Sequence, residues 1–383
     1  MENVQKTTIQ LIRYILTGDV PVIDTDTDFE LLYGFSRSHG VECMVYDALK
    51  KLDTPIPSGP AGKFENAYIA NVMIDTMQTE ALKEISQAFE NAGIDHIPLK
   101  GSTVKFLYPM PHYRKCGDID ILIKPEDEGK TEKVMTELGY KVETGWCEHD
   151  IHATFKKGQN VEIEIHKRLV SPYERSSNFC DDVWKFVILL ADKKNRYGMI
   201  NGFLYVYLLS HICKHLYYGG AGIRLVTDLY VVKNRLTLDE KEVADFVIKA
   251  KLTELEGMLN PIMKNWFEKC GVVSDESRII EKFIFESESF GNSELHESVL
   301  SSDSLTGKLS RFRRQVFPTA GWLKMRYETL SKKSYPLIYM WIYSWTYILK
   351  KKRYKIPKYI KETFSSKRKN EGLKKIVKAI RNN

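Results

Sequence analysis

The sequence predicts a mixed α/β (α+β) protein, in which a small mixed sheet within residues 94–170 is flanked by N- and C-terminal helical regions. The residues before 94 place apolar side chains at helical spacing. Residues 94–170 consist largely of short apolar segments separated by turns, and helical spacing returns after residue 170. We therefore expect four regions: 1–93, 94–170, 171–290 and 291–383.

The N-terminal region is expected to be mostly helical. Its clearest helix carries apolar residues three or four positions apart, which form one stripe: Ile74, Met77, Ala81, Leu82, Ile85, Ala88 and Phe89. Gly93 follows the stripe and is expected to end the helix, because glycine is the usual residue at a helix C-terminus. We expect this region to serve in packing or to form substrate-side structure.

The central region contains five segments with the length and composition of strands: IDHIPL, DIDILI, KVET, IHATF and VEIEIH. Between two of them lies PEDEGKTEKVMTELGY. This segment begins with Pro125 and acidic residues and reaches a glycine at Gly139, as a helix with a proline start and a glycine stop does.

After residue 170 the most apolar helix is expected at FLYVYLLSHICKHL, and the polar run GNSELHESVLSSDSLTG is expected to connect it to the C-terminal region. The segment YPLIYMWIYSWTYIL, from Tyr335 to Leu349, is shorter than the roughly twenty residues that span a bilayer. We expect it to form a buried helix. A helix on an anionic membrane surface is the alternative, because lysines follow its Trp and Tyr side chains.

The cysteines and the distribution of charge indicate the cellular compartment of the protein and the partners of its C-terminal tail. The six cysteines form no CxxC pair and the N-terminus lacks a signal-peptide pattern, which predicts a cytoplasmic protein with free thiols. From Lys350 to Asn383 there are fourteen Lys or Arg and two Glu, whereas the rest of the chain is mildly acidic. This basic tail suits RNA phosphates or an anionic membrane surface, and a solvated tail is the alternative.

The strongest chemical signal is a set of acidic residues on two predicted strands. Strand alternation places Asp118 and Asp120 on one face of DIDILI and the isoleucines on the other. In VEIEIH the polar face carries Glu162, Glu164 and His166. Paired carboxylates repel each other unless a divalent cation binds them, so neighbouring strands would create a site for Mg²⁺ or Mn²⁺. A solvated sheet face is the alternative interpretation.

A converging set of carboxylates is what two-metal nucleotidyl transfer requires, with one acid also accepting the proton of the attacking hydroxyl. Upstream, Lys100, Gly101 and Ser102 follow an apolar strand and precede a short helix. A turn of this kind can present backbone N–H groups and a hydroxyl to phosphates. The pattern therefore favours an enzyme that handles a nucleoside triphosphate.

The segments LKGSTVKFLYP, RKCGDIDILI, ELGY and VEIEIH together resemble the bacterial "uncharacterised nucleotidyltransferase" family of the DNA polymerase β-like nucleotidyltransferase superfamily. HICKHL, Arg224 with Asp228, and FPTAGWLKMRY resemble its later segments, so the likeness covers most of the chain. The spacer from Ser102 to Asp118 is longer than in many superfamily members, and the third acid is Glu where Asp is common there.

The resemblance implies that residues 94–170 are the nucleotidyltransferase catalytic core. It also implies a role for each matching residue. Gly101 and Ser102 would hold the β- and γ-phosphates, and Lys100 and Arg114 would contact phosphate. The metal ligands would be Asp118, Asp120 and Glu164, with Glu162 as the fallback for the third carboxylate.

Two further pairs have simple structural interpretations. His211 and His215 stand four apart on a helix, but no third zinc ligand is evident, so we expect local hydrogen bonds. Arg224 and Asp228 have the spacing of an ion pair on one helix. A contact from this pair to substrate is the alternative.

These observations predict a nucleotidyltransferase that moves an NMP from an NTP to a hydroxyl of a small molecule, a tRNA or a protein. One alternative is a catalytically silent module that binds a nucleotide or a partner. The other is a membrane-surface accessory protein of envelope polysaccharide synthesis, which would act at the periphery of the membrane.

Overall fold

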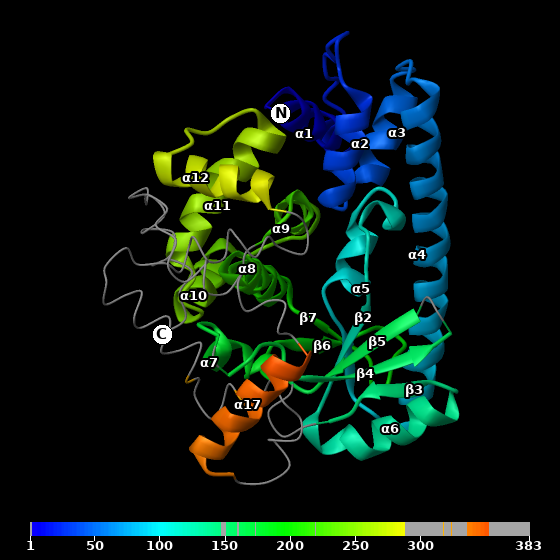
Figure 1. Cartoon of the computed structure of the whole chain (residues 1–383), viewed down its shortest axis with the longest axis vertical. Helices are drawn as coiled ribbons and strands as arrows, with labels where there is room; N and C mark the ends of the chain where they lie inside the picture. The colour runs from blue at the N-terminus through cyan, green and yellow to red at the C-terminus, as the bar shows by residue number, and fades with distance from the viewer. Residues whose placement is uncertain are drawn as a thin grey trace.

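A computed structural model describes residues 2–146, 151–158, 161–172, 174–218, 220–287, 317, 323 and 335–351. It is a mixed α/β structure with a five-stranded sheet and many helices, as expected from the sequence. Figure 1 shows the sheet at one end of the long helix α4, with a second group of helices beside it.

The N-terminal helices are α1 Glu2–Thr17, α2 Phe29–Ser38, α3 Glu42–Lys51 and α4 Ser58–Ala92. The predicted apolar stripe lies on α4, a single helix of 35 residues that runs along one side of the molecule (Figure 1). Gly93 is its C-cap with a φ of 63°, which confirms the predicted stop, because this left-handed conformation favours glycine.

The sheet has the strand order β1-β2-β5-β4-β3, and each of its strands falls on a predicted segment. The strands are β1 His96–Pro98, β2 Ile119–Ile123, β3 Lys141–Thr144, β4 His152–Lys157 and β5 Val161–His166. β2 and β5 are parallel, and the other neighbouring pairs are antiparallel. The central pair β2–β5 therefore brings together the two acidic segments that the sequence singled out.

The connections around β2 are short helices. Between β1 and β2 lie α5 Gly101–Val104, η1 Lys105–Leu107 and η2 Pro111–Tyr113, and after β2 come η3 Pro125–Asp127 and α6 Glu128–Glu137. The long spacer before β2 is anchored on α4, where the buried Lys105 donates from Nζ to Asp75 Oδ1 at 2.8 Å. The long spacer between Ser102 and Asp118 is thus attached to the N-terminal helices.

The two faces of the sheet belong to different cores. Ile119, Ile121 and Ile123 of β2 pack with residues of α4 and of the segment around α6. Leu122, on the opposite face of the same strand, packs with residues of α1–α3 and of the helices after residue 200. The sheet is therefore covered on its isoleucine face, and its polar face turns toward the second helical group.

The second helical group begins with α7 Ser177–Cys180, η4 Val183–Lys185 and a hairpin of β6 Val187–Leu189 and β7 Tyr197–Met199. Five helices follow: α8 Asn201–Tyr218, α9 Ile223–Arg235, α10 Glu240–Lys249, α11 Thr253–Glu268 and α12 Asp275–Glu286. The hairpin was not among the predicted strands. One core contains residues of both helical groups, so the two pack together. The region boundaries at 93, 170 and 290 stay a prediction.

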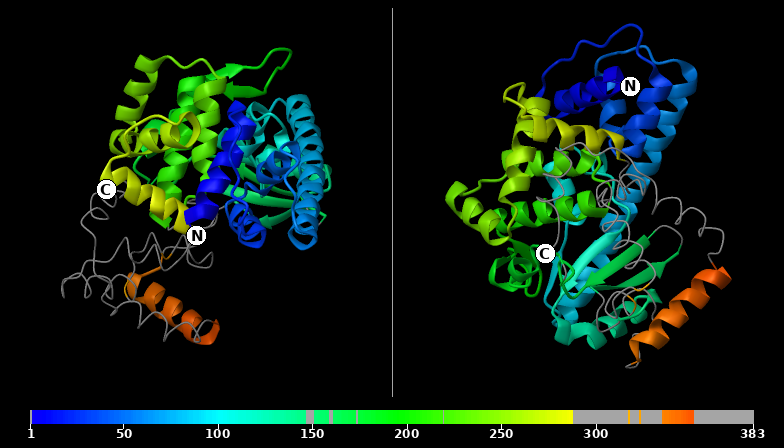
Figure 2. Two further views of the ribbon diagram at one scale, coloured as in Figure 1. Left: turned by 90° about the horizontal axis from the view of Figure 1, so that it is seen from above. Right: turned by 60° about the vertical axis from the view of Figure 1, so that its left-hand side comes forward.

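The C-terminal segment of aromatic residues forms α17 Leu337–Lys351, which lies at the edge of the body in both views of Figure 2. The expectation of a buried helix is correct for one face only. Met340 is fully buried, whereas Ile338 is 66% and Ile342 50% exposed. No described helix is long and apolar enough to cross a membrane.

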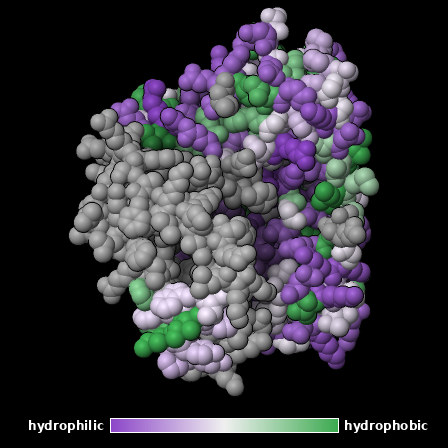
Figure 3. All heavy atoms as spheres, in the orientation of Figure 1, coloured by the Kyte–Doolittle hydropathy of each residue, from purple (hydrophilic) through white to green (hydrophobic). Residues whose placement is uncertain are grey.

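The described surface on the face shown in Figure 3 is mainly hydrophilic over α4 and the sheet, and α17 carries some of its hydrophobic colour. The predicted connection at 291–307 and the basic tail from residue 352 lie outside the described residues. Cys43, Cys116, Cys180, Cys213 and Cys270 are free, as expected, and Cys147 lies outside the described residues.

Candidate active site

Three carboxylates meet on the polar face of the β2–β5 pair. Asp120 lies directly opposite Glu164 in the parallel register, and Asp118 precedes β2 by one residue. One oxygen of each carboxylate lies within 4.8 Å of the others. The structure thus places all three acids where the sequence predicts that they converge.

Two basic side chains bind the middle carboxylate of this cluster. Lys100 Nζ lies 3.0 Å and His166 Nε2 lies 2.7 Å from the same atom, Asp120 Oδ1. His166 Nε2 also lies 3.3 Å from Glu164 Oε2. Asp120 and His166 are both buried, so these contacts act with little screening by solvent.

The three acids differ in how their environment treats a negative charge. Burial alone would raise the pKa of Asp120, but the charges of Lys100 and His166 outweigh burial and hold this pKa far below its usual range. Burial, and then the charges of Asp120 and Glu164, raise the pKa of Asp118 to about 6. Of the three acids, Asp118 is therefore the one whose negative charge its surroundings favour least.

His152 of β4 is a site residue that the sequence analysis missed. It pairs with His166 across the β4–β5 register, and its Nε2 lies 3.6 Å from Glu164 Oε1. Burial lowers its pKa, which favours the neutral imidazole. The sequence holds one sign of this role: His152 lies in the predicted strand IHATF, where it shares a strand face with the polar Thr154.

The residues present fit a divalent cation. Asp118, Asp120 and Glu164 supply the carboxylate oxygens that Mg²⁺ and Mn²⁺ prefer. His152, Glu164 and His166 form a second group with ligand atoms within the same range. Within the described part of the chain these are the two groups of this kind, and both lie on this face of the sheet.

Glu162 stands apart from the cluster. It faces Lys156 of β4, with 3.1 Å between Lys156 Nζ and Glu162 Oε2, and its side chain is 41% exposed. Since Glu164 faces Asp120 while Glu162 is engaged elsewhere, the geometry favours Glu164 as the third carboxylate. The catalytic roles of both residues stay predictions.

The turn before α5 is strained at Lys100. This residue has a φ of 40° and a ψ of −115°, a backbone conformation that glycine adopts far more easily than other residues. Burial would lower the pKa of Lys100, but Asp120, with smaller contributions from Tyr207 and Asp118, outweighs burial and raises this pKa. The contact of Lys100 Nζ with Asp120 Oδ1 at 3.0 Å is an interaction that offsets this strain.

Gly101 is needed because a guanidinium packs against it. A Cβ at this position would collide with Arg114 Nη1 and would lie 2.5 Å from Cys116 Sγ. The amides of the next two residues are engaged within the turn, since Ser102 N donates to the Leu99 carbonyl at 3.0 Å and Thr103 N to the Lys100 carbonyl at 3.1 Å. These two amides are therefore not free to bind phosphate, although the sequence predicts free N–H groups at this turn.

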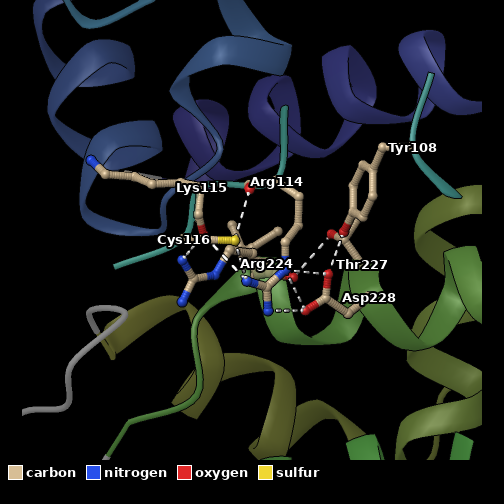
Figure 4. A network of polar contacts seen from close by, with 8 residues as sticks. Tyr108, Arg114, Lys115, Cys116, Arg224, Thr227 and Asp228 are labelled. Atoms are coloured by element: carbon tan, nitrogen blue, oxygen red, sulfur yellow. Dashed lines mark hydrogen bonds and ion pairs between the residues drawn. The ribbon is translucent and has the colours of Figure 1, made fainter. Parts of the chain in front are cut away.

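Arg114 is held by protein groups on every side (Figure 4). Its Nη2 lies 2.9 Å from Asp228 Oδ2, its Nε also donates to Asp228, and its Nη1 donates to Cys116 Sγ at 3.2 Å. Tyr108 donates to Asp228 Oδ1 at 2.7 Å. A phosphate contact by Arg114, as predicted from the sequence, would require it to exchange one of these partners.

The expected ion pair between Arg224 and Asp228 is wrong. Asp228 binds Arg114 and Tyr108, both distant in sequence, and Arg224 donates to the Lys115 carbonyl instead. The i,i+4 spacing is present, but a buried carboxylate binds the guanidinium that approaches it with bidentate geometry. Arg224 and Asp228 each bind the segment that leads into β2, and both therefore join α9 to it.

One face of α8 looks toward the carboxylates. Tyr207, His211 and His215 lie at helical spacing, and the charges of Lys100 and Asp120 act on the first two. Burial first, then nearby lysines, lower the pKa of His215 to about 4, so its imidazole is neutral. The Tyr207 hydroxyl is buried with no partner among the described residues. Those residues also supply no third ligand for a zinc ion at the two histidines.

Comparison with known proteins gives a family match. Residues 25–268 match the model of a family described as "Uncharacterised nucleotidyltransferase". No curated protein matches the chain. Among solved structures, that of the antibiotic-resistance factor ANT(2'')-Ia is similar, with 12% sequence identity and a TM-score of 0.36 over 48% of this chain and 97% of that one. A score this low does not establish a shared fold.

The strain at Lys100 can be isolated by comparing Lys100→Gly with Lys100→Ala. Both variants lose the ammonium, but only glycine accepts the φ of 40° without strain. We expect Lys100→Gly to be more stable than Lys100→Ala by about 1 kcal/mol in urea unfolding. Equal stabilities, or a more stable alanine variant, would contradict a strained backbone at this turn.

Proposed function

This chain belongs to the uncharacterised nucleotidyltransferase family, and from that premise we propose that it transfers an NMP from an NTP to a hydroxyl acceptor with the help of a divalent metal. The acceptor is a small molecule, a tRNA or a protein. The observation that supports the metal-dependent reaction is the meeting of Asp118, Asp120 and Glu164 within 4.8 Å. A costly cluster of like charges suits a bound cation.

Mg²⁺ or Mn²⁺, when bound, would neutralise the triphosphate and lower the pKa of the attacking hydroxyl. Asp118 and Asp120 would hold the metal through their carboxylate oxygens, and Glu164 would complete the set. Lys100 lies 3.0 Å from Asp120 and carries three donors, so it can bind a phosphate oxygen beside that carboxylate. Ser102, buried at the turn, would offer its hydroxyl to the same phosphates.

Glu164 is the proposed acceptor of the proton from the attacking hydroxyl. Its Oε2 faces His166 at 3.3 Å and its Oε1 faces His152 at 3.6 Å, so both oxygens have a neighbour that orients them. Burial would raise the pKa of Glu164, but the hydrogen bond from His166 and the charges of His152 and His166 together outweigh burial and lower it. The carboxylate is therefore ionised and able to take a proton.

The acceptor would enter between the carboxylates and α8. His211 and His215 on that helix are kept neutral by burial, which lowers the pKa of both. Neutral imidazoles and the unpaired Tyr207 hydroxyl can each donate or accept a hydrogen bond. This lining suits a polar acceptor whose hydroxyl groups need orientation.

The proposed reaction is tested by incubating the protein with each α-labelled NTP and Mg²⁺ in a cell extract. Label should move to one class of molecule, and Asp120→Asn should abolish the transfer because it removes a metal ligand while keeping the side-chain shape. Persistent transfer by Asp120→Asn would refute this use of the carboxylates. Metal-dependent binding of an NTP without any transfer would favour the silent binding module.

The choice between the two strand acids has a matched pair of variants, Glu164→Gln and Glu162→Gln. Loss of a general base lowers the rate at saturating NTP by roughly two to four orders of magnitude, and we expect this loss for Glu164. Glu162 contacts Lys156 and should cost much less. The reverse order of measured rates would move the role to Glu162, and small equal losses would mean that neither acid is the base.

A further inference from the structure

Glu164 is shared by two groups of metal-ligating side chains. One group contains Asp118 and Asp120, and the other contains His152 and His166. The histidine group spans β4 and β5, which pair antiparallel with His152 directly opposite His166. β4 flanks β5 on the side away from β2 (Figure 1). Glu164 therefore has carboxylates on one side and an imidazole from β4 on the other.

The histidine group has the spacing of ligands around a tetrahedral metal ion. His166 Nε2 lies 3.3 Å from Glu164 Oε2, and His152 Nε2 lies 3.6 Å from Glu164 Oε1. Bonds of about 2.0–2.1 Å to a zinc ion place neighbouring ligand atoms about 3.3 Å apart in a tetrahedron. The two imidazole centroids are 5.0 Å apart. The three side chains can therefore close around one small ion with little movement.

The donor atoms of this group suit a different ion from the one that the carboxylates favour. Mg²⁺ is held by oxygen atoms, whereas imidazole nitrogen suits Zn²⁺. Two histidines and one glutamate fill three positions of a tetrahedral zinc ion and leave the fourth for water. The identity of the ion therefore decides which of the two groups claims Glu164.

The histidine group is open to solvent at one end. The side chain of His152 is 31% exposed and that of His166 is 4% exposed, so an ion can enter from the β4 side. A histidine in a permanent metal site usually donates its other ring N–H to a protein group. The Nδ1 atoms of both histidines are buried without a hydrogen-bond partner among the described residues. These features suit an ion that exchanges with the solution.

An ion in this group would replace one existing contact. His166 Nε2 lies 2.7 Å from Asp120 Oδ1, and a metal on this nitrogen would take the place of that hydrogen bond. Asp120 would keep Lys100, whose Nζ lies 3.0 Å from the same oxygen. Glu164 would become a ligand of the ion and could no longer accept a proton. Occupation of the histidine group therefore opposes use of Glu164 in transfer.

We propose that His152, Glu164 and His166 bind Zn²⁺, and that this ion inhibits the transfer reaction by occupying Glu164. The inhibition rests on the proposed function, because it requires Glu164 to act in transfer. The binding of Zn²⁺ does not rest on it. His152 is the ligand to change in a test, because it belongs to the histidine group alone and comes from a different strand than the other two ligands.

Co²⁺ tests the binding directly, because it replaces Zn²⁺ in tetrahedral sites and then absorbs visible light strongly. The nucleotide-free chain should develop this absorption, and added Zn²⁺ should remove it. His152→Ala should bind Co²⁺ at least about tenfold more weakly, because a ligand is lost. Unaltered Co²⁺ affinity in this variant would overturn the proposal. Should it not fold, His152→Gln keeps the length and polarity of the side chain without the imidazole.

Thr154→Val is the matched control. Thr154 lies opposite Glu164 on the same face of β4, and valine keeps its branched shape while removing only the hydroxyl. This variant should bind Co²⁺ as the unmodified chain does. Asp118→Asn should also retain Co²⁺ binding, because Asp118 is outside the histidine group. Loss of the absorption in Asp118→Asn with its retention in His152→Ala would place the ion among the carboxylates and overturn the proposal.

Inhibition is measured as the Zn²⁺ concentration that halves the Mg²⁺-dependent transfer rate of each variant, relative to its own rate without Zn²⁺. His152→Ala should require at least about tenfold more Zn²⁺ than Thr154→Val. Equal concentrations would refute inhibition through His152. Tetrahedral Co²⁺ binding in a protein that transfers no label would refute the transfer reaction alone. Transfer that Zn²⁺ does not inhibit, in a chain without the Co²⁺ absorption, would refute this inference alone.

Discussion

The repulsion among three carboxylates is the constraint on which the rest of the site depends. Asp118, Asp120 and Glu164 are fixed side by side because β2 and β5 pair in parallel register, and the isoleucines between them are locked into the core behind. Asp120 and Glu164 cannot separate without breaking the pairing of β2 and β5. The charge has to be balanced by other groups, which are Lys100 and His166 at Asp120.

Several unusual features of the surroundings follow from that balance. Lys100 accepts a backbone conformation suited to glycine so that its ammonium reaches Asp120. Gly101 has no side chain because Arg114 fills the space beneath it, and Arg114 is in turn fixed by Asp228 of α9. Loss of one partner from a buried pair of this kind costs about 3–5 kcal/mol, so the second helical group is coupled to the turn at Lys100 and Gly101.

The sequence predicts the parts of this structure that depend on local patterns. The alternation in VEIEIH gives β5 and its polar face, and Gly93 gives the end of α4, because both signals lie within a few residues. The partner of Arg114 lies 114 positions away, so spacing cannot reveal it, and the sequence predicts the nearby Arg224 as the partner of Asp228 instead. His152 was missed because its role comes from Glu164 and His166 on the neighbouring strand. The hairpin from Val187 was missed because its strands are three residues long and partly exposed, so they show no clear alternation.

In the metal site that we propose for the three acids, Lys100 competes with the metal for Asp120. Titration of the nucleotide-free protein with Mn²⁺, with the free ion followed by electron paramagnetic resonance, measures this competition. Asp120→Asn should bind Mn²⁺ roughly tenfold more weakly than the unmodified chain, and Lys100→Met should bind it more tightly because the competing cation is gone. Equal Mn²⁺ affinity in Asp120→Asn and the unmodified chain would rule out a metal site at Asp120.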